Sequence, residues 1–135
     1  MSIELWSLFA VFGVMLFSVL AQGTYLDLRA GIPYVLSSRA EPPPNHGPLG
    51  ARLDRNVRNQ VEGLALFLPL VLISATSGIS NGWTETAALT YAGSRAAYVP
   101  SYAFDLVPVR TLVWAAGLAS LFAFAWGLTT GALSA

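Results

Sequence analysis

Residues 51–76 read ARLDRNVRNQVEGLALFLPLVLISAT, and this stretch changes character at its middle. It is polar through Glu62 and apolar from Leu64 onward. A helix needs about 20 mostly apolar residues to cross the hydrocarbon core of a bilayer. The stretch therefore predicts a membrane-spanning helix with a charged segment at one end.

Three further apolar stretches accompany this one along the chain. The first covers residues 3–26, and because Glu4 rather than basic residues precedes its apolar part, we expect a retained helix and not a secretory signal. The others cover residues 84–104 and 109–133, separated by short turns. We predict one all-α domain over residues 1–135, an integral membrane four-helix bundle with helices at about 3–26, 51–76, 84–104 and 109–133.

The composition supports a membrane protein and excludes several kinds of site. Of the residues, 55% are hydrophobic and only 10% are charged, far below the charge content of a soluble domain. The formal net charge is zero, so we expect no nucleic-acid binding. The absence of cysteine excludes disulfides and thiolate metal sites. The single histidine, His46, lies among prolines, where we expect a solvated loop residue, and we predict no metal site.

The segment from residue 29 to residue 50 is rich in helix breakers, including Gly31, Pro33 and the run at 42–44. We predict that these residues break any helix and form a surface loop. A connection of this length is long for a compact bundle and is often functional.

The arginines predict the orientation of the bundle in the membrane. They gather in or beside the first and third connections, whereas the second connection carries no charge between residues 77 and 84. By the positive-inside rule the first and third connections are cytoplasmic and both termini are extracytoplasmic. The arginines that decide this are Arg29, Arg39, Arg52, Arg55, Arg58 and Arg110.

The polar part of residues 51–76 forms a stripe. Arg52, Arg55, Asn59 and Glu62 follow one another at spacings of three, four and three, and Arg58 lies one position to the side. Charges at membrane depth normally face protein, water or ligand. Contact with anionic lipid headgroups would explain the first two arginines. It does not explain the amide and the carboxylate that continue the stripe, so we favour a ligand site.

A second stripe lies in the third predicted helix, where Arg95, Tyr98 and Tyr102 share one face. Aromatic residues at this spacing are usually packing, but two phenols beside an arginine could also hydrogen-bond an anion. Arg110 begins the fourth helix on the same membrane side as the first stripe. Arginines suit carboxylates and Glu62 suits an amine, so a small zwitterionic peptide fits the predicted cavity.

These motifs resemble the membrane-associated proteins in eicosanoid and glutathione metabolism, the family of microsomal glutathione transferases and of leukotriene C4 and prostaglandin E synthases. The resemblance covers nearly the whole chain, most specifically Arg52-x-x-Arg55-x-x-Arg58-Asn59-x-x-Glu62. Arg95-x-x-Tyr98-x-x-x-Tyr102 and Arg110 follow in the right order. Two positions differ from well-known members: Val57 replaces a histidine or glutamine, and Gly63 replaces an asparagine or aromatic residue.

The resemblance implies a homotrimer that binds glutathione between subunits, toward the cytoplasmic side. It also implies a bacterial member in the inner membrane, in contact with lipids and a lipophilic substrate. By position, Arg110 would be the catalytic residue that lies nearest the sulfur. The residues implied in glutathione binding are Arg52, Arg55, Arg58, Asn59, Glu62, Arg95, Tyr98 and Tyr102.

The leading hypothesis is thus a glutathione-dependent transferase or peroxidase that acts on lipophilic electrophiles or lipid hydroperoxides. A neighbouring guanidinium would favour the thiolate of a thiol whose pKa is otherwise about 8.5. The alternative is a non-catalytic lipid-binding or accessory protein of the same fold. A small four-helix drug exporter ranks below both, because such proteins usually carry a solitary carboxylate in the first helix, whereas arginines surround Glu62 here.

Overall fold

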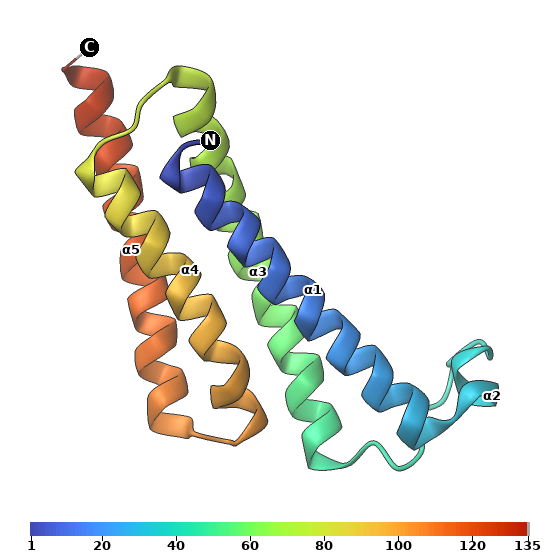
Figure 1. Cartoon of the computed structure of the whole chain (residues 1–135). Helices are drawn as coiled ribbons and strands as arrows, with labels where there is room; N and C mark the ends of the chain where they lie inside the picture. The colour runs from blue at the N-terminus through green and yellow to red at the C-terminus, as the bar shows by residue number, and fades with distance from the viewer. Residues whose placement is uncertain (135) are drawn as a thin grey trace.

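The computed structural model describes residues 1–134, which form five helices and no strand. In chain order these are α1 (Ile3–Ala30), α2 (Ile32–Val35), α3 (Gly47–Ser77), α4 (Gly82–Ala103) and α5 (Val107–Leu133) (Figure 1). The element α2 is a single turn, and the other four are long. The prediction of an all-α fold is confirmed.

Local sequence signals set the ends of the long helices. The hydroxyl of Ser2 accepts a backbone N–H from the first turn of α1, and α1 is followed directly by Gly31, whose φ of 84° suits glycine. The side chain of Asn81 caps α4 and exchanges hydrogen bonds with Thr84 in a capping box. At the end of α3, Gly78 adopts the left-handed conformation typical of a helix C-terminus.

The predicted loop at residues 29–50 is shorter than expected. The helix α1 continues to Ala30, α2 follows directly, and α3 begins at Gly47. Pro48 lies in the first turn of α3, where its fixed φ favours a helix and its missing N–H costs nothing. The prediction that this segment breaks every helix was therefore wrong at both ends, and within it only Gly31 and residues 36–46 lie outside helices.

Three helices, α1, α3 and α5, are long and apolar enough to cross a membrane. The chain is therefore an integral membrane protein. The helix α4, predicted as a fourth span, is not among them because it carries more polar residues. Several of these are buried against the rest of the chain, namely Thr84, Ser94, Arg95 and Ser101. These polar side chains of α4 thus face the interior of the bundle.

The long helices are arranged as two neighbouring pairs. Figure 1 shows α1 beside α3 and α4 beside α5, and α1 also packs against α4. The start of α1 and the end of α5 lie at one end of the bundle, and α2 and the α4–α5 turn lie at the other. The predicted arginine-rich connections therefore share one end, as the orientation prediction requires.

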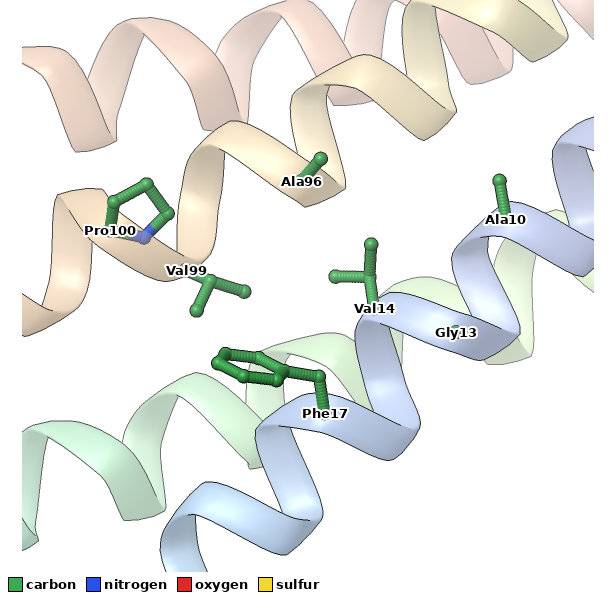
Figure 2. Close-up of a pocket in the computed structure, with 7 residues that line it drawn as sticks. All are labelled: Ala10, Gly13, Val14, Phe17, Ala96, Val99 and Pro100. Carbon is green, nitrogen blue, oxygen red and sulfur yellow. The ribbon is translucent and has the colours of Figure 1, made fainter.

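An apolar groove of about 440 Å³ separates parts of α1 and α4 (Figure 2). We call it the α1–α4 groove. It is lined by Ala10, Gly13, Val14 and Phe17 of α1 and by Ala96, Val99 and Pro100 of α4. No charged side chain lines it, so it offers space for an apolar molecule but no chemistry for a charged one.

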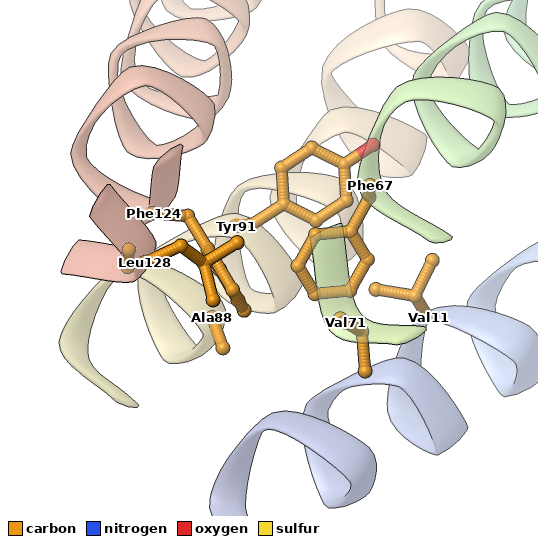
Figure 3. Packing of buried hydrophobic residues seen from close by; sticks show 8 residues of the cluster. Val11, Phe67, Val71, Ala88, Tyr91, Phe124 and Leu128 are labelled. Carbon is orange, nitrogen blue, oxygen red and sulfur yellow. The ribbon is translucent and has the colours of Figure 1, made fainter. Parts of the chain in front are cut away.

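The four long helices meet in one core of buried residues (Figure 3). The Phe67 ring of α3 stacks on the Tyr91 ring of α4 with their centroids 4.2 Å apart. The ring of Phe124 from α5 meets Phe67 edge-on at 6.0 Å. Such aromatic pairs stabilise a fold beyond the area that they bury. They fix α3, α4 and α5 relative to one another at the level where the site residues begin.

A buried carboxylate joins α1 to α4 at the end of the bundle opposite α2. The side chain of Glu4 is fully buried, and its Oε1 accepts hydrogen bonds from Thr84 at 2.6 Å and Ser80 at 2.9 Å. The sequence had suggested only a residue at the edge of the first helix. Burial of a carboxylate is costly unless hydrogen bonds satisfy it, so this contact fixes how α1 docks.

Candidate functional site

The centre of the site is a hydrogen-bonded contact between α3 and α4. The side-chain amide of Asn59 donates to the Tyr98 hydroxyl at 2.9 Å and to the Tyr102 hydroxyl at 3.0 Å. The two tyrosine rings are buried, with their centroids 5.0 Å apart. Polar residues from the two predicted stripes thus meet, and the phenols retain the capacity to donate to an acceptor.

Arg110 lies beside this contact, near the start of α5. Its guanidinium carbon is 4.8 Å from the centroid of the Tyr102 ring, a cation–π geometry. A cavity of about 230 Å³ opens here, lined by Asn59, Tyr98, Arg110, Thr111 and Trp114. A cation and the Tyr98 phenol therefore border one space, which is suited to a small anion.

Asp105 is a member of the site that the sequence analysis did not identify. Its carboxylate lies 3.3 Å from a terminal nitrogen of Arg52 and 4.0 Å from one of Arg110. It sits in the α4–α5 turn with a φ of 55°, an uncommon value for a residue with a side chain. A signal was present, because Asp105 is the one charge in the apolar turn between the third and fourth predicted helices. It places a negative charge between two arginines.

Arg95 lies deeper in the bundle and is only 4% exposed. Its guanidinium carbon is 4.9 Å from the Tyr91 ring and 5.3 Å from the Tyr98 ring. Within residues 1–134 no carboxylate lies close enough to form an ion pair with it. A carboxylate usually stabilises a buried cation, but here the faces of the two aromatic rings do so.

Two glycines make the space that the Arg95 side chain occupies. A methyl group at Gly63 of α3 would lie 2.6 Å from the Tyr91 hydroxyl and 3.1 Å from Arg95. A methyl group at Gly117 of α5 would lie 2.6 Å from a terminal nitrogen of Arg95. Gly63 is one of the positions that differ from well-known members of the resembled family, and here the guanidinium fills the space beside it.

A second cavity, of about 190 Å³, adjoins the first and shares Asn59 and Trp114 with it. Its polar lining includes Glu62, Tyr91 and Arg95, and its apolar lining is Leu66, Leu118 and Leu121. Because it contains both a carboxylate and a guanidinium, this cavity suits a group that carries both signs of charge.

The buried face of α3 also carries two amides that the sequence analysis passed over. Asn56 and Gln60 are each 1% exposed, and the Gln60 side chain donates to the backbone carbonyl of Arg95 at 3.2 Å. The helical spacing of four between them was the available signal. Gln60 thereby ties α3 to α4 next to the buried guanidinium.

The structure does not bring every predicted site residue into this group. Arg55 and Arg58 line neither cavity, whereas Glu62 lines the second one. All three residues are exposed on the protomer, and none forms an ion pair within the described part of the chain. They lie on the same helix as the exposed apolar residues Val61 and Leu66. Charges on such a surface are costly in lipid, so this face requires water, ligand or another protein surface.

The prediction for His46 was wrong about solvation: the residue lies in the loop, as expected, but its side chain is largely buried. Its Nε2 lies 2.7 Å from a carboxylate oxygen of Asp54, and the other oxygen accepts from the Gln22 side chain at 2.7 Å. The Tyr25 hydroxyl donates to the His46 carbonyl at 2.8 Å, and the ring packs over the backbone of Gly50. The histidine is therefore a largely buried residue that holds the start of α3 against α1.

Comparison with protein families gives a match over nearly the whole chain. The model of the MAPEG family matches residues 3–130, a range that contains all the site residues described above. The chain belongs to the MAPEG family. Comparisons with curated proteins and with solved structures gave no significant match.

Membership in the MAPEG family agrees with an integral membrane protein of all-α structure. At the level of the family it also supports a glutathione-related transferase or peroxidase function, since MAPEG proteins use glutathione. No group of three or more histidine or acidic side chains that could hold a metal ion occurs among residues 1–134 of this MAPEG protein.

Proposed function

We propose that this MAPEG protein is a membrane-bound glutathione-dependent transferase or peroxidase that acts on lipophilic electrophiles or lipid hydroperoxides. The observation that carries the proposal is the cavity bordered by Asn59, Tyr98 and Arg110, next to Tyr102, in a chain of this family. This cavity combines groups that can hydrogen-bond a peptide with a cation that can stabilise a thiolate.

The residues divide between the parts of glutathione by their chemistry. Asn59 would hydrogen-bond the peptide, Glu62 would pair with its ammonium group, and Arg55 would pair with a carboxylate. Tyr98 and Tyr102 would line the opposite side. Arg52, Arg58 and Arg95 would contribute supporting positive charge.

Arg110 would act on the sulfur. A free thiol is only a few per cent ionised at neutral pH, and a guanidinium beside it favours the thiolate. The thiolate then attacks an electrophilic carbon, forming a carbon–sulfur bond, and the proton released from the thiol passes to solvent or to the leaving group. With a hydroperoxide the thiolate would attack the terminal oxygen, giving an alcohol and a sulfenic acid that a second glutathione converts to disulfide and water.

The charges on the outer face of α3 support assembly around a shared site. Arg55, Arg58 and Glu62 form no ion pair within the described residues of one protomer, and their face includes apolar side chains. A neighbouring copy would cover this face and enclose glutathione, which agrees with a homotrimer. The arginine-rich end would face the cytoplasm, with both termini on the other side of a bacterial inner membrane.

The proposal is tested by titrating the purified protein in detergent with glutathione while thiolate absorbance in the ultraviolet is followed. We expect a saturable thiolate signal at millimolar glutathione and below, reduced in Arg110→Gln. Arg39→Gln is the matched control, because Arg39 donates to a carbonyl of α2 and lies in the connection, outside both cavities. Absence of both binding and thiolate would overturn the proposal.

A second function has one observation in its favour. The α1–α4 groove is apolar, open and lined by no charged residue, and it could hold an acyl chain in a protein that does no chemistry. The same titration separates the two functions. A lipid-binding protein would retain lipid during purification and show no thiolate signal.

A further inference from the structure

The hydroxyl of Tyr91 is buried and has no hydrogen-bond partner within residues 1–134. Its ring is fixed in the core, where it stacks on the Phe67 ring with the centroids 4.2 Å apart. Figure 3 shows the hydroxyl directed toward α3. An unpaired buried hydroxyl costs free energy, and each such group calls for an explanation. Packing explains the ring of Tyr91 but not its hydroxyl.

A second donor that lacks partners lies beside this hydroxyl. Arg95 is only 4% exposed, and its Nε has no hydrogen-bond partner in the described part of the chain. A methyl group at Gly63 of α3 would lie 2.6 Å from the Tyr91 hydroxyl and 3.1 Å from a terminal nitrogen of Arg95. The two side chains therefore converge on the surface of Gly63. An oxygen atom close to Gly63 could accept a hydrogen bond from both, as in an oxyanion hole.

This pair of donors belongs to the second cavity, whose volume is about 190 Å³. Its apolar lining consists of leucines, so the cavity suits the hydrocarbon part of a lipophilic molecule. It shares Asn59 and Trp114 with the cavity that Arg110 borders. A substrate in the second cavity would thus place an oxygen at the two donors and lie beside a thiolate held by Arg110.

We propose that Tyr91 is a catalytic acid in the reduction of lipophilic hydroperoxides, and that its hydroxyl protonates the oxygen that leaves the peroxide. Arg95, whose guanidinium carbon lies 4.9 Å from the centroid of the Tyr91 ring, stabilises the negative charge on that oxygen and then on the phenolate. This role rests on the proposed function, because glutathione supplies the thiolate.

The step balances with glutathione as the reductant. The thiolate sulfur attacks the terminal oxygen of the hydroperoxide, a sulfur–oxygen bond forms, and the oxygen–oxygen bond breaks with its electron pair on the inner oxygen. That oxygen takes the proton of the Tyr91 hydroxyl and leaves as an alcohol, while the sulfur is oxidised to a sulfenic acid. The Tyr91 phenolate regains a proton from the thiol of a second glutathione. The second thiolate forms the disulfide, and the hydroxide that it displaces combines with the proton of the first thiol to give water.

Conjugation differs from this reaction in its need for a proton. When a thiolate replaces chloride on an aryl halide, the chloride leaves as a stable anion and requires no acid. An alkoxide is far more basic, so its departure benefits from a positioned proton donor. Loss of the Tyr91 hydroxyl should therefore slow one reaction selectively, whereas a disturbed fold or weaker glutathione binding would slow both.

The test compares Tyr91→Phe with the unmodified full chain in detergent. The probes, each supplied with glutathione, are cumene hydroperoxide as a lipophilic peroxide and chlorodinitrobenzene as an aryl halide. We expect the kcat for peroxide reduction, followed as glutathione disulfide, to fall by about a hundredfold, as on loss of a general acid. The kcat for conjugation should fall much less. The variant should fold, because the hydroxyl that it removes makes no hydrogen bond within residues 1–134.

Tyr34→Phe is the matched control, because the Tyr34 hydroxyl donates to the Glu41 carbonyl and lines neither cavity. It should leave the ratio of the two activities unchanged. An unchanged ratio in Tyr91→Phe would overturn the role of Tyr91 but not the proposed function, which the activity of the unmodified protein would still support. Conjugation without any peroxide reduction by the unmodified protein would do the same. Absence of both reactions from the unmodified protein would overturn the proposed function as well.

Discussion

The guanidinium of Arg110 lies over the ring of Tyr102, 4.8 Å from its centroid. These residues come from α5 and α4, on either side of the α4–α5 turn. The ring face limits where the guanidinium can lie, and the side chain is partly buried. Arg110 is therefore held beside the cavity before any ligand arrives, as a residue that stabilises a developing anion should be.

Replacing Arg110 should affect chemistry more than binding. In Arg110→Ala we expect the turnover number for conjugation to fall by about a hundredfold, the order lost when one stabilising group is removed from an anionic centre. The dissociation constant of glutathione should rise much less. Single-turnover kinetics and equilibrium titration measure the two quantities separately. Unchanged turnover would show that another residue activates the sulfur.

Asp105 should keep Arg52 and Arg110 together at the mouth of the cavity. In Asp105→Asn the two guanidiniums lose the carboxylate between them and repel one another. We expect the pKa of bound glutathione thiol to rise toward its solution value as Arg110 moves away. A pH titration of thiolate absorbance measures this, with Asp27→Asn as a control at the same membrane end. A lower thiol pKa in Asp105→Asn would instead show that Asp105 only competes with the thiolate for the positive charge of Arg110.

The helices were largely predictable because lipid imposes a simple rule on composition. Apolar runs of about the membrane thickness are visible in any sequence, and the four long helices of the structure each overlap one predicted run. The positions of the helix ends were harder to predict from the sequence. The start of α3 at Gly47 depends on Pro48 in its first turn and on the contact of His46 with Tyr25 of α1, and the residues around the loop do not reveal that contact on their own.

The site was predictable where it follows helical periodicity and hidden where it depends on tertiary contact. Spacing alone placed Asn59 on one stripe and Tyr98 and Tyr102 on another, and the structure brings these within hydrogen-bonding distance. Asp105 could not be paired with Arg52 in this way, because a turn with a left-handed residue brings them together. Glu4 likewise meets Thr84 only through the packing of α1 on α4.

The glycines that flank Arg95 should tolerate no side chain. In Gly63→Ala the new methyl group would meet the fully buried Tyr91, and we expect a loss of about 1–3 kcal/mol in stability, typical of overpacking. Gly93 of α4 is the matched control, because a methyl group there would have no neighbour within 4 Å. Gly93→Ala should be neutral or stabilising, since alanine favours a helix. Thermal unfolding in detergent compares them, and equal melting temperatures would contradict this account.

Asn59 should matter for the affinity of glutathione through the tyrosines. In Asn59→Ala both phenols lose a donor and their hydroxyls can rotate freely. With two hydrogen bonds lost at about 1 kcal/mol each, we expect the KM for glutathione to rise by up to about thirtyfold with a smaller change in kcat. Asn45→Ala, in the loop before α3, serves as the control. A fall in kcat without a rise in KM would instead show that Asn59 acts in the chemical step.

Glu62 should link glutathione to assembly, because it lines the second cavity and is also exposed on the outer face of α3. If a neighbouring copy covers that face, Glu62→Ala removes the carboxylate that would pair with the ammonium group of glutathione. It also leaves the positive charge of nearby arginines without a compensating negative charge. We expect weaker glutathione binding together with a shift toward smaller oligomers, measured by light scattering in detergent with the micelle subtracted. Glu41→Ala, which changes a carboxylate in the loop, should alter neither. Weakened glutathione binding with an unchanged oligomeric state would show that Glu62 acts only on the ligand, whereas unchanged binding would show that Glu62 is not part of the site.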